Sequence, residues 1–358
     1  MTISSDDTTP CLAIIECGPF ATIQDFGRFG WQRFGISASG AMDPVAMALA
    51  NTLVGNDGAT AVIEMALLGA TVRVEAPCRI ALTGAEGPVS IDGSPAESWR
   101  AYDLAAGTTF KIGAARTGMR FYLAVAGGFD LPPVLGSLST HTRSELGGFE
   151  GRPLRAGDRL PLARPDAASG APLVLPVDRR PHLSGDIRVV LGPQADAFTE
   201  AGLETFLSAT YLMSDRADRM GCELDGPVVE HRDGFNIVSD GIMNGSIQVP
   251  GHGRPIVLLA DRQSTGGYPK IATVIEPDLP RLAQRRPGEP VRFVAVEAFE
   301  AEDIAIRHRA AIAAMCGAVT EVVTGAAALT SERLLAANLV SGAVCAFADP
   351  FADGPLPS

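Results

Sequence analysis

Lysine is nearly absent from this sequence: of its 29 lysine and arginine residues, only Lys111 and Lys270 are lysines. We ascribe this bias first to genome composition. Acidic residues outnumber basic ones, and the formal net charge is -12. A phosphate backbone or an anionic membrane surface would repel such a chain at long range. We therefore expect neither nucleic acid nor a membrane among its partners.

Long hydrophobic runs and paired cysteines are also missing. No apolar run reaches the roughly 18 residues that a membrane span needs. The first ten residues are acidic, whereas a signal peptide begins with basic residues. The six cysteines are scattered without a C-x-x-C pair, at Cys11, Cys17, Cys78, Cys222, Cys316 and Cys345. These features predict a cytoplasmic protein with reduced, structural thiols; disulfides in an exported protein are the alternative.

Familiar catalytic motifs are absent as well. The sequence contains no G-x-x-x-x-G-K-[ST] phosphate loop, no H-E-x-x-H zinc motif and no G-x-S-x-G nucleophile motif. The five histidines are far apart in sequence, at His141, His182, His231, His252 and His308. Because metal sites need several ligands close together, we predict no metal site.

The composition that remains is that of a globular protein, 46% hydrophobic and 20% charged. A chain of 358 residues exceeds what one hydrophobic core usually serves, so two domains are expected. Short apolar or β-branched runs between Gly, Pro, Asp and Asn predict a mainly β structure with a few helices. Clear examples are 71–74, 79–83, 110–112, 121–126 and 187–191.

Helical spacing is confined to a few segments. We predict helices at 44–54, where Asp43 can act as the N-cap, and at 195–207 and 303–315. Residues 163–184 are rich in Pro, Ala and Arg, which predicts a connector between two domains. The domain boundary is therefore expected near residue 180.

Two further elements are predicted in the second half. Asn244-Gly245 lies between apolar runs, which favours a hairpin turn of the I′ type. Residues 329–344 contain Thr330 and Ser331 ahead of an apolar-faced pattern, so a capped helix is expected there.

Polar residues near the start are the first site candidates. Asp25 and Arg28 are three positions apart within 23–43, where they could serve a site or form an ion pair that fixes the loop. Glu64 lies inside the apolar run 62–68 and needs a partner if it is buried. A buried carboxylate is a site candidate, and a paired structural role is the alternative.

Segment 136–148 is a second candidate. It places Ser137 and Thr140 between glycines, and their hydroxyls could donate to a carboxylate or a phosphoryl group. An ordinary loop explains the segment equally well.

Segment 261–270, DRQSTGGYPK, gathers the greatest variety of polar groups. The residues of interest are Asp261, Thr265, Gly266, Gly267, Tyr268 and Lys270. The aspartate is expected at a strand end, the glycines permit close backbone approach, the tyrosine can stack, and the lysine brings a cation into an acidic protein. The competing interpretation is a strand connection with one surface lysine, which the residues alone slightly favour.

Several stretches taken together resemble one known family. In the first half they are GPFATIQDFGRFGWQRFGISASGAMD, ANTLVGND, IEMALLGA and IALTGA, and in the second half the match runs through 239–293. The chain resembles the KipA family, also called allophanate hydrolase subunit 2, the C-subunit of 5-oxoprolinase or the carboxyltransferase-like domain of urea carboxylase. The similarity spans roughly residues 14–295. His141 stands where the family pattern has an aromatic residue, which leaves the specificity of that loop open.

The resemblance implies two tandem cyclophilin-like β-barrel domains. The first would cover 1–180, with its connector at 163–180, the second 181–300, and a helical extension and tail 301–358. It also implies a KipI-like partner protein and a small-molecule substrate. Some members join a third, lactam-utilisation protein and hydrolyse 5-oxoproline to glutamate with ATP. In urea carboxylases the same units move a carboxyl group from carboxybiotin to urea.

For this chain the resemblance implies a 5-oxoprolinase subunit within a hetero-oligomeric enzyme, with ATP and Mg as cofactors of the whole complex. The sequence has no A-M-K-M attachment motif, so covalently attached biotin is not expected. The expected catalytic residues are Lys270, Asp261 and Asp43. The expected ligand-binding residues are Arg28, Asp25, Ser137, Thr140, Gln248, Thr265, Gly266, Gly267 and Tyr268.

Two other functions stay open at this point. One is the carboxyltransferase component of a biotin-dependent carboxylase for urea or another small amide. The other is a non-enzymatic, KipA-type antagonist of a sensor-kinase inhibitor. The sequence does not decide the substrate, the stoichiometry, or which protein of the complex supplies each catalytic group.

Overall fold

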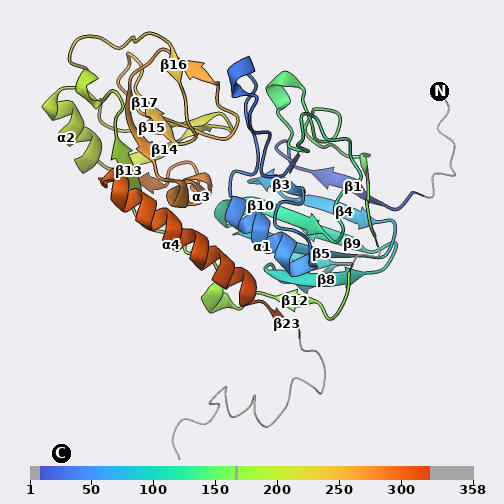
Figure 1. Cartoon of the computed structure of the whole chain (residues 1–358). Helices are drawn as coiled ribbons and strands as arrows, with labels where there is room; N and C mark the ends of the chain where they lie inside the picture. The colour runs from blue at the N-terminus through green and yellow to red at the C-terminus, as the bar shows by residue number, and fades with distance from the viewer. Residues whose placement is uncertain (1–8, 166–167, 323–358) are drawn as a thin grey trace, which may run out of the picture. The chain divides into compact units, whose positions relative to one another are not determined.

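The computed structural model describes residues 9–165 and 168–322 (Figure 1). Short strands make up most of the regular structure there, which confirms the predicted mainly β class with a few helices. In the described part of the chain, no helix is both long enough and apolar enough to cross a membrane. The helix predicted at 329–344 lies outside the described residues.

The first half of the chain forms two antiparallel sheets. Strand order in the first sheet is β11-β1-β4-β9-β6-β7. Its strands are β1 (Cys11–Cys17), β4 (Ala70–Val74), β6 (Val89–Ile91), β7 (Ser94–Ala96), β9 (Thr109–Ile112) and β11 (Arg159–Pro161). The second sheet contains, in spatial order, β2 (Thr22–Gln24), β3 (Val62–Ala66), β10 (Thr117–Val125), β5 (Cys78–Glu86), β8 (Arg100–Leu104) and β12 (Leu173–Val174).

Alternation along β10 divides the first half into two apolar clusters. Phe121 and Leu123 pack into the core between the two sheets, whereas Tyr122 and Ala124 pack against α1 (Pro44–Val54). This division follows because successive side chains of a strand point to opposite faces. Helix α1 has the predicted bounds, and the Asp43 side chain caps it by accepting a hydrogen bond from the Ala46 N–H at 2.9 Å.

The second half forms a mixed sheet around its own apolar cluster. Strand order is β21-β14-β15-β18-β17-β20-β13-β22, in which only the β13–β22 pair is parallel. The strands are β13 (Ile187–Leu191), β14 (Tyr211–Ala217), β15 (Gly221–Asp225), β17 (Ser246–Gln248), β18 (Ile256–Leu258), β20 (Lys270–Val274), β21 (Pro290–Val291) and β22 (Phe293–Ala295). Phe206 stacks on Phe293 in the core, with ring centres 4.7 Å apart. A separate small pair is β16 (Asp240–Gly241) with β19 (Thr265–Gly266).

Helices cover the sheets at a few places. The α-helices after α1 are α2 (Glu200–Ser208), α3 (Leu279–Ala283) and α4 (Ala298–Gly317). The 3-10 helices are η1 (Gln32–Phe34), η2 (Thr142–Ser144), η3 (Val177–Arg179), η4 (Ala195–Ala197) and η5 (Glu276–Asp278). Helix α4 runs from the second half toward α1, as Figure 1 shows, and its Ile312 and Met315 pack against the cluster that α1 forms. The last short strand is β23 (Thr320–Glu321).

Helix bounds differ from the prediction at two places. Residues 195–197 form η4, and α2 begins only at Glu200, because the Thr199 side chain accepts a hydrogen bond from the Gly202 N–H and caps the helix there. Helix α4 is longer than the predicted 303–315 at both ends.

The predicted hairpin at Asn244-Gly245 is wrong. Strand β16 before the turn pairs with β19, and β17 after it pairs with β18 and β20. A type I′ turn needs positive φ at both central residues, and of these two only Gly245 has it, at 89°. The turn therefore separates strands of different sheets.

Part of the predicted connector at 163–184 belongs to the first half. Strand β12 pairs with β8, and the Arg79 guanidinium donates hydrogen bonds to the carbonyl oxygens of 169–171. The segment is thus attached to the second sheet by both backbone and side-chain bonds. The domain boundaries given above stay predictions.

Candidate functional site

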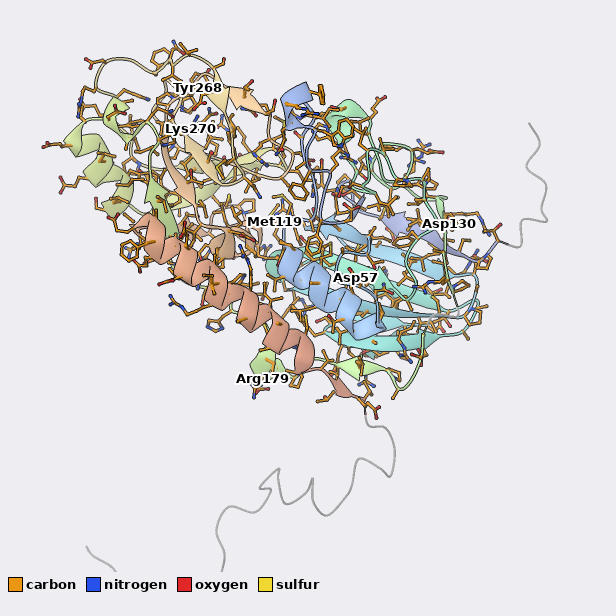
Figure 2. The ribbon with its side chains drawn as sticks, viewed as in Figure 1. Asp57, Met119, Asp130, Arg179, Tyr268 and Lys270 are labelled. Atoms are coloured by element: carbon orange, nitrogen blue, oxygen red, sulfur yellow. The ribbon has the colours of Figure 1, made fainter. Side chains whose placement is uncertain are left out.

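A cleft of about 330 Å³ lies where β3 and β10 of the first half meet the β14–β15 turn of the second half. We call it the central cleft. Apolar side chains line it together with charged ones, and Met119, labelled in Figure 2 between the two halves, is one of the apolar group. Its charged residues are Glu64, Arg120, Arg143, Asp215, Asp218, Arg219 and Asp261.

Glu64 is the least exposed carboxylate of the central cleft. It belongs to β3, whose residues are all buried, and it is only 2% exposed. Its Oε1 accepts a hydrogen bond from Arg219 Nη1 at 2.5 Å, and its Oε2 accepts one from the Met42 N–H at 2.8 Å. The buried carboxylate singled out in the sequence is therefore compensated on several sides.

Arg219 joins the two halves of the chain. From the turn between β14 and β15, its Nε and Nη2 donate to the two carboxylate oxygens of Asp261 at 2.9 and 3.0 Å, and Nη2 also donates to the Gly40 carbonyl at 2.6 Å. Burial lowers the pKa of Arg219, but the Asp261 and Glu64 carboxylates outweigh it and hold that pKa above its ordinary value. Arg219 is therefore a fixed cation that aligns two carboxylates.

Arg120 supplies the second buried cation. It is 4% exposed on β10, and its Nη1 donates to the Ala283 carbonyl of the second half. Its Nε lies 3.9 Å from Glu64 and makes no hydrogen bond to any described residue. One guanidinium N–H at the cleft is thus left unsatisfied, which is a costly arrangement that a polar ligand or water could relieve.

A layer of buried polar groups lies behind the central cleft. The Gln284 amide donates to Asp43 Oδ2 at 2.9 Å and to the Arg120 carbonyl at 3.1 Å. The Asp43 N–H donates to the Tyr122 hydroxyl at 2.8 Å. Burial raises the pKa of Asp43, against hydrogen bonds from Ala46 and Gln284 that lower it. Burial also raises the pKa of Tyr122 well above its usual range.

The predicted ligand-binding residues of the first half form a separate cluster. The Asp25 carboxylate accepts hydrogen bonds from the hydroxyls of Ser137 and Ser139, at 2.6 and 2.5 Å, and from the Gly27 N–H at 2.7 Å. An ion pair between Asp25 and Arg28 was the structural alternative for these two residues, but the described residues include no such pair. Asp25 instead fastens two loops together.

Arg28 and Thr140 are buried in the same region. The Arg28 guanidinium donates to the carbonyl oxygens of Ser139 and, at 3.5 Å, Val134, while its Nη1 has no hydrogen-bond partner among the described residues. Burial lowers the pKa of Arg28, and nearby carboxylates oppose that effect. The Thr140 hydroxyl donates to the Ile23 carbonyl at 3.0 Å. These contacts hold loops, and none of the predicted residues in this cluster lines the central cleft.

Of segment 261–270, Asp261 alone lines the central cleft. Lys270 is 2% exposed, and its Nζ donates to Asp240 Oδ2 at 2.6 Å and to the Gly241 carbonyl at 3.1 Å. Figure 2 shows Lys270 and Tyr268 in the second half, apart from Met119. The structure therefore does not bring Lys270, Asp261 and Asp43 together in one cavity.

The glycines of this segment have a structural explanation. Thr265 and Gly266 form β19 opposite β16, and Gly267 follows directly. A Cβ at Gly266 would lie 2.7 Å from the Gln248 amide nitrogen, which in turn donates to the Tyr268 carbonyl at 3.2 Å. The close approach expected at Gly266 is thus made by a side chain of the protein itself.

Sequence inspection missed Arg120 and Arg219. Arg120 lies inside the apolar strand 117–125, opposite Ala66 and two positions before Tyr122, which pairs with Glu64. An arginine within one apolar run of the sequence and a glutamate within another could have indicated that the two side chains lie close together. Arg219 lies in a polar turn and carried no such signal.

Known proteins are similar to this chain over most of its length. The family model "Carboxyltransferase domain, subdomain A and B" matches residues 34–295. The chain belongs to this carboxyltransferase-domain family. It is 40% identical over 295 residues to the 5-oxoprolinase C-subunit of Escherichia coli, a match that covers 81% of this chain and 93% of the relative.

A second relative and a solved structure are also similar to this chain. The chain is 39% identical over 288 residues to the 5-oxoprolinase C-subunit of Haemophilus influenzae, covering 80% of this chain and 92% of that protein. The crystal structure of the K. lactis urea amidolyase superposes on 87% of this chain with a TM-score of 0.81 and 27% identity. This chain corresponds to only 20% of that much longer protein.

Proposed function

We propose that this protein is a subunit of a hetero-oligomeric amidohydrolase, an ATP-dependent 5-oxoprolinase that converts 5-oxoproline to glutamate with a KipI-like partner protein. The observation that carries the proposal is the 40% identity to the C-subunit of 5-oxoprolinase over 93% of that relative's length. An identity spread over almost the whole relative supports a shared role better than a match to one segment of it.

The central cleft supplies suitable chemistry for this substrate. 5-Oxoproline carries a carboxylate beside a planar cyclic amide. Arginine binds carboxylates in a fork of two hydrogen bonds. Arg143, whose side chain is 64% exposed at the rim, and the unsatisfied Nε of Arg120 are the donors proposed to hold that carboxylate. Apolar neighbours such as Met119 would pack against the ring.

The carboxylates of the central cleft are proposed to orient the attacking water. Hydrolysis adds a hydroxyl to the lactam carbon and breaks its bond to nitrogen, which takes up a proton. Asp261 and Glu64 are held by Arg219, so their free lone pairs keep a defined direction. We place substrate contact at Asp261 and not at Lys270, since Lys270 is bonded to Asp240 and lies outside the cleft.

ATP does not fit the central cleft of this chain. Of the guanidinium groups of Arg120 and Arg219, only the Arg120 Nε is free of a hydrogen bond to a described residue, and four carboxylates line the same walls. A triphosphate would meet those negative charges at short range. We therefore propose that ATP binds elsewhere in the complex and assign it no contact here.

Reconstitution tests the proposed function. The full chain would be combined with its KipI-like partner and the lactam-utilisation protein, and glutamate would be measured after addition of 5-oxoproline and ATP. We expect ATP-dependent glutamate release. An intact complex that releases no glutamate would overturn the proposal.

A variant at the cleft rim tests the substrate contact. Arg143→Gln should raise the KM for 5-oxoproline about tenfold with a smaller effect on kcat, because one charge-assisted hydrogen bond to the carboxylate is lost. Arg155→Gln, at a side chain that is 70% exposed, is the matched control. Equal KM values for the two variants would exclude Arg143 as the carboxylate ligand.

The structural likeness to urea amidolyase supports a second candidate, transfer of a carboxyl group to urea or a related amide. Because this chain carries no biotin-attachment motif, that reaction would need biotin carboxylase and carrier chains. Adding these chains with urea, bicarbonate and ATP distinguishes the two: carboxylation of urea without glutamate release favours the carboxyltransferase. Binding of the KipI-like partner with neither reaction favours the non-enzymatic antagonist.

A further inference from the structure

A second cavity, of about 230 Å³, lies among the connector, β13, α3 and α4. We call it the arginine cavity because Arg180, Arg188 and Arg281 line it, along with His182 and His308. No residue lines both this cavity and the central cleft. Figure 2 labels Arg179, the neighbour of Arg180, beside the C-terminal end of α4.

Three guanidinium groups are concentrated here in a protein whose net charge is -12. One buried carboxylate, Asp278, compensates two of them: Arg188 donates to it at 2.9 and 2.6 Å, and Arg281 at 3.2 Å. Asp43 also lines the cavity, and its carboxylate accepts hydrogen bonds from the Ala46 N–H and the Gln284 amide. Three guanidinium groups thus face two carboxylates. The lining therefore has an excess of positive charge.

Arg180 is the least engaged of the three arginines. Its Nη1 lies 3.8 Å from Glu86, beyond hydrogen-bond distance, and its guanidinium carbon is 5.9 Å from the centre of the Trp99 ring. Its Nε has no hydrogen-bond partner among the described residues. Yet its side chain is only 21% exposed. The buried Nε is thus left without a hydrogen bond, which is unfavourable and which a bound anion could supply.

Two further groups complete the lining on the side of α4 and α3. The Arg281 side chain is 24% exposed, so its guanidinium is accessible as well as paired. Burial is the main cause that lowers the pKa of His308, and the charges of Arg188 and Arg281 add to it. An imidazole at this position can donate an N–H in either protonation state.

We propose that the arginine cavity binds a small oxyanion, a carboxylate or phosphate group of a metabolite, through Arg180 and Arg281. Guanidinium groups match the planar carboxylate and the phosphate oxygens in geometry as well as in charge. The volume of the cavity restricts the ligand to a small molecule. Arg188 remains on Asp278 and supports the site without having to move.

This site adjoins the layer behind the central cleft. Asp43, on its wall, accepts a hydrogen bond from Gln284, and Gln284 donates to the carbonyl of Arg120, which lines the cleft. An anion in the arginine cavity would therefore lie one layer of hydrogen-bonded groups from the cleft. The binding proposal itself does not depend on the function proposed above.

Calorimetric titration of the full chain at low ionic strength tests the proposal. Inorganic phosphate and succinate serve as the two probes, and they separate the phosphate source from the carboxylate source. We expect saturable binding of at least one of them. Arg180→Gln should weaken that binding about tenfold or more, through loss of charge-assisted hydrogen bonds.

Two control variants locate the site. Arg307→Gln removes an exposed arginine of α4 that does not line the cavity, and Arg143→Gln removes an arginine of the central cleft. Arg307→Gln should bind the probe as the unmodified protein does, and Arg143→Gln shows whether the probe binds in the central cleft instead. Arg281→Gln is the second cavity variant, and unchanged thermal unfolding without ligand shows that a weakened variant is folded.

Weakening by Arg180→Gln or Arg281→Gln, with Arg307→Gln and Arg143→Gln unaffected, supports the site, and the probe that binds identifies the anion class. The proposal is overturned if neither probe binds, if Arg143→Gln alone abolishes binding, or if all four variants bind equally.

Discussion

Glu64 is a single side chain on which several buried groups depend. It is 2% exposed and lies between Arg219 and Arg120, so its negative charge compensates cations that are themselves removed from water. Breaking such a buried arrangement costs far more than breaking a surface pair. We expect Glu64→Gln to lower the free energy of unfolding by about 3 kcal/mol, as measured by urea denaturation.

A surface carboxylate provides the comparison. Glu150 pairs with Arg152 at 2.7 Å, but its side chain is 63% exposed. Glu150→Gln should therefore cost at most about 1 kcal/mol. Equal losses in the two variants would contradict the buried role of Glu64.

Asp43 makes stability depend on pH in an unusual direction. Because burial raises its folded-state pKa, the stability it contributes is complete below its ordinary pKa of 3.8 and is lost as the pH rises through the higher value. The non-titrating variant Asp43→Asn lacks this contribution. The free energy of unfolding of the unmodified protein, minus that of the variant, should fall as the pH rises from 3.8 toward neutrality.

Chemical denaturation at a series of pH values measures this difference. Asp130→Asn, at an exposed aspartate, provides the baseline for the same buffers. A difference for Asp43→Asn that is flat or rises with pH would show that burial does not control this carboxyl group.

At the scale of elements, a bulge between β5 and β10 positions Arg120. The strand register shifts between Thr117 and Phe121, and Gly84 on β5 has φ of 86° at this point. A Cβ there would come within 2.2 Å of the Arg120 carbonyl oxygen. Gly84→Ala must therefore displace β10 at a residue that lines the central cleft.

We expect Gly84→Ala to cost about 3 kcal/mol or more of unfolding free energy and to reduce turnover in the reconstituted complex. Gly93→Ala separates the cost of backbone strain at positive φ from the cost of the clash with β10. Its φ of 82° is similar, but nothing lies within 4 Å of the added Cβ. It should cost about 1 kcal/mol, from backbone strain alone. Thermal unfolding of both variants checks this, and a smaller cost for Gly84→Ala than for Gly93→Ala would refute the packing argument.

At the scale of the whole molecule, Gln284 connects the two halves. From the end of α3 its Oε1 accepts hydrogen bonds from the Met119 and Arg120 N–H groups at 2.9 and 2.8 Å, and its amide donates to Asp43. Gln284→Leu keeps the size of the side chain but leaves these buried groups without partners. We expect a loss of about 3 kcal/mol and a less cooperative calorimetric transition.

The control for this variant is Gln263→Leu, at an exposed glutamine. It should leave both the midpoint and the shape of the transition nearly unchanged. A Gln284→Leu protein that unfolds like the control would mean that the contact between the halves rests on other groups.

Local patterns are sufficient to predict much of the fold. Helix α1 has its predicted bounds because its cap, Asp43, and its first residue, Pro44, are neighbours in sequence. The predicted hairpin at Asn244-Gly245 is wrong because the turn sequence does not reveal which strands pair on either side. Pairing is decided by the packing of the whole sheet.

The candidate site, like the fold, is predicted in part by local sequence and decided in part by packing. The order of residues is enough to establish the β-rich class, the cap of α1, and the presence of a carboxylate, Glu64, that needs a partner when it is buried. Folding of the whole chain settles that Arg219 and Asp261 lie with it, and that Lys270 pairs with Asp240 outside the cleft. The physical reason is that a charge within an apolar strand can be recognised from its immediate neighbours in sequence. Its partner, in contrast, depends on which strands and turns meet in space.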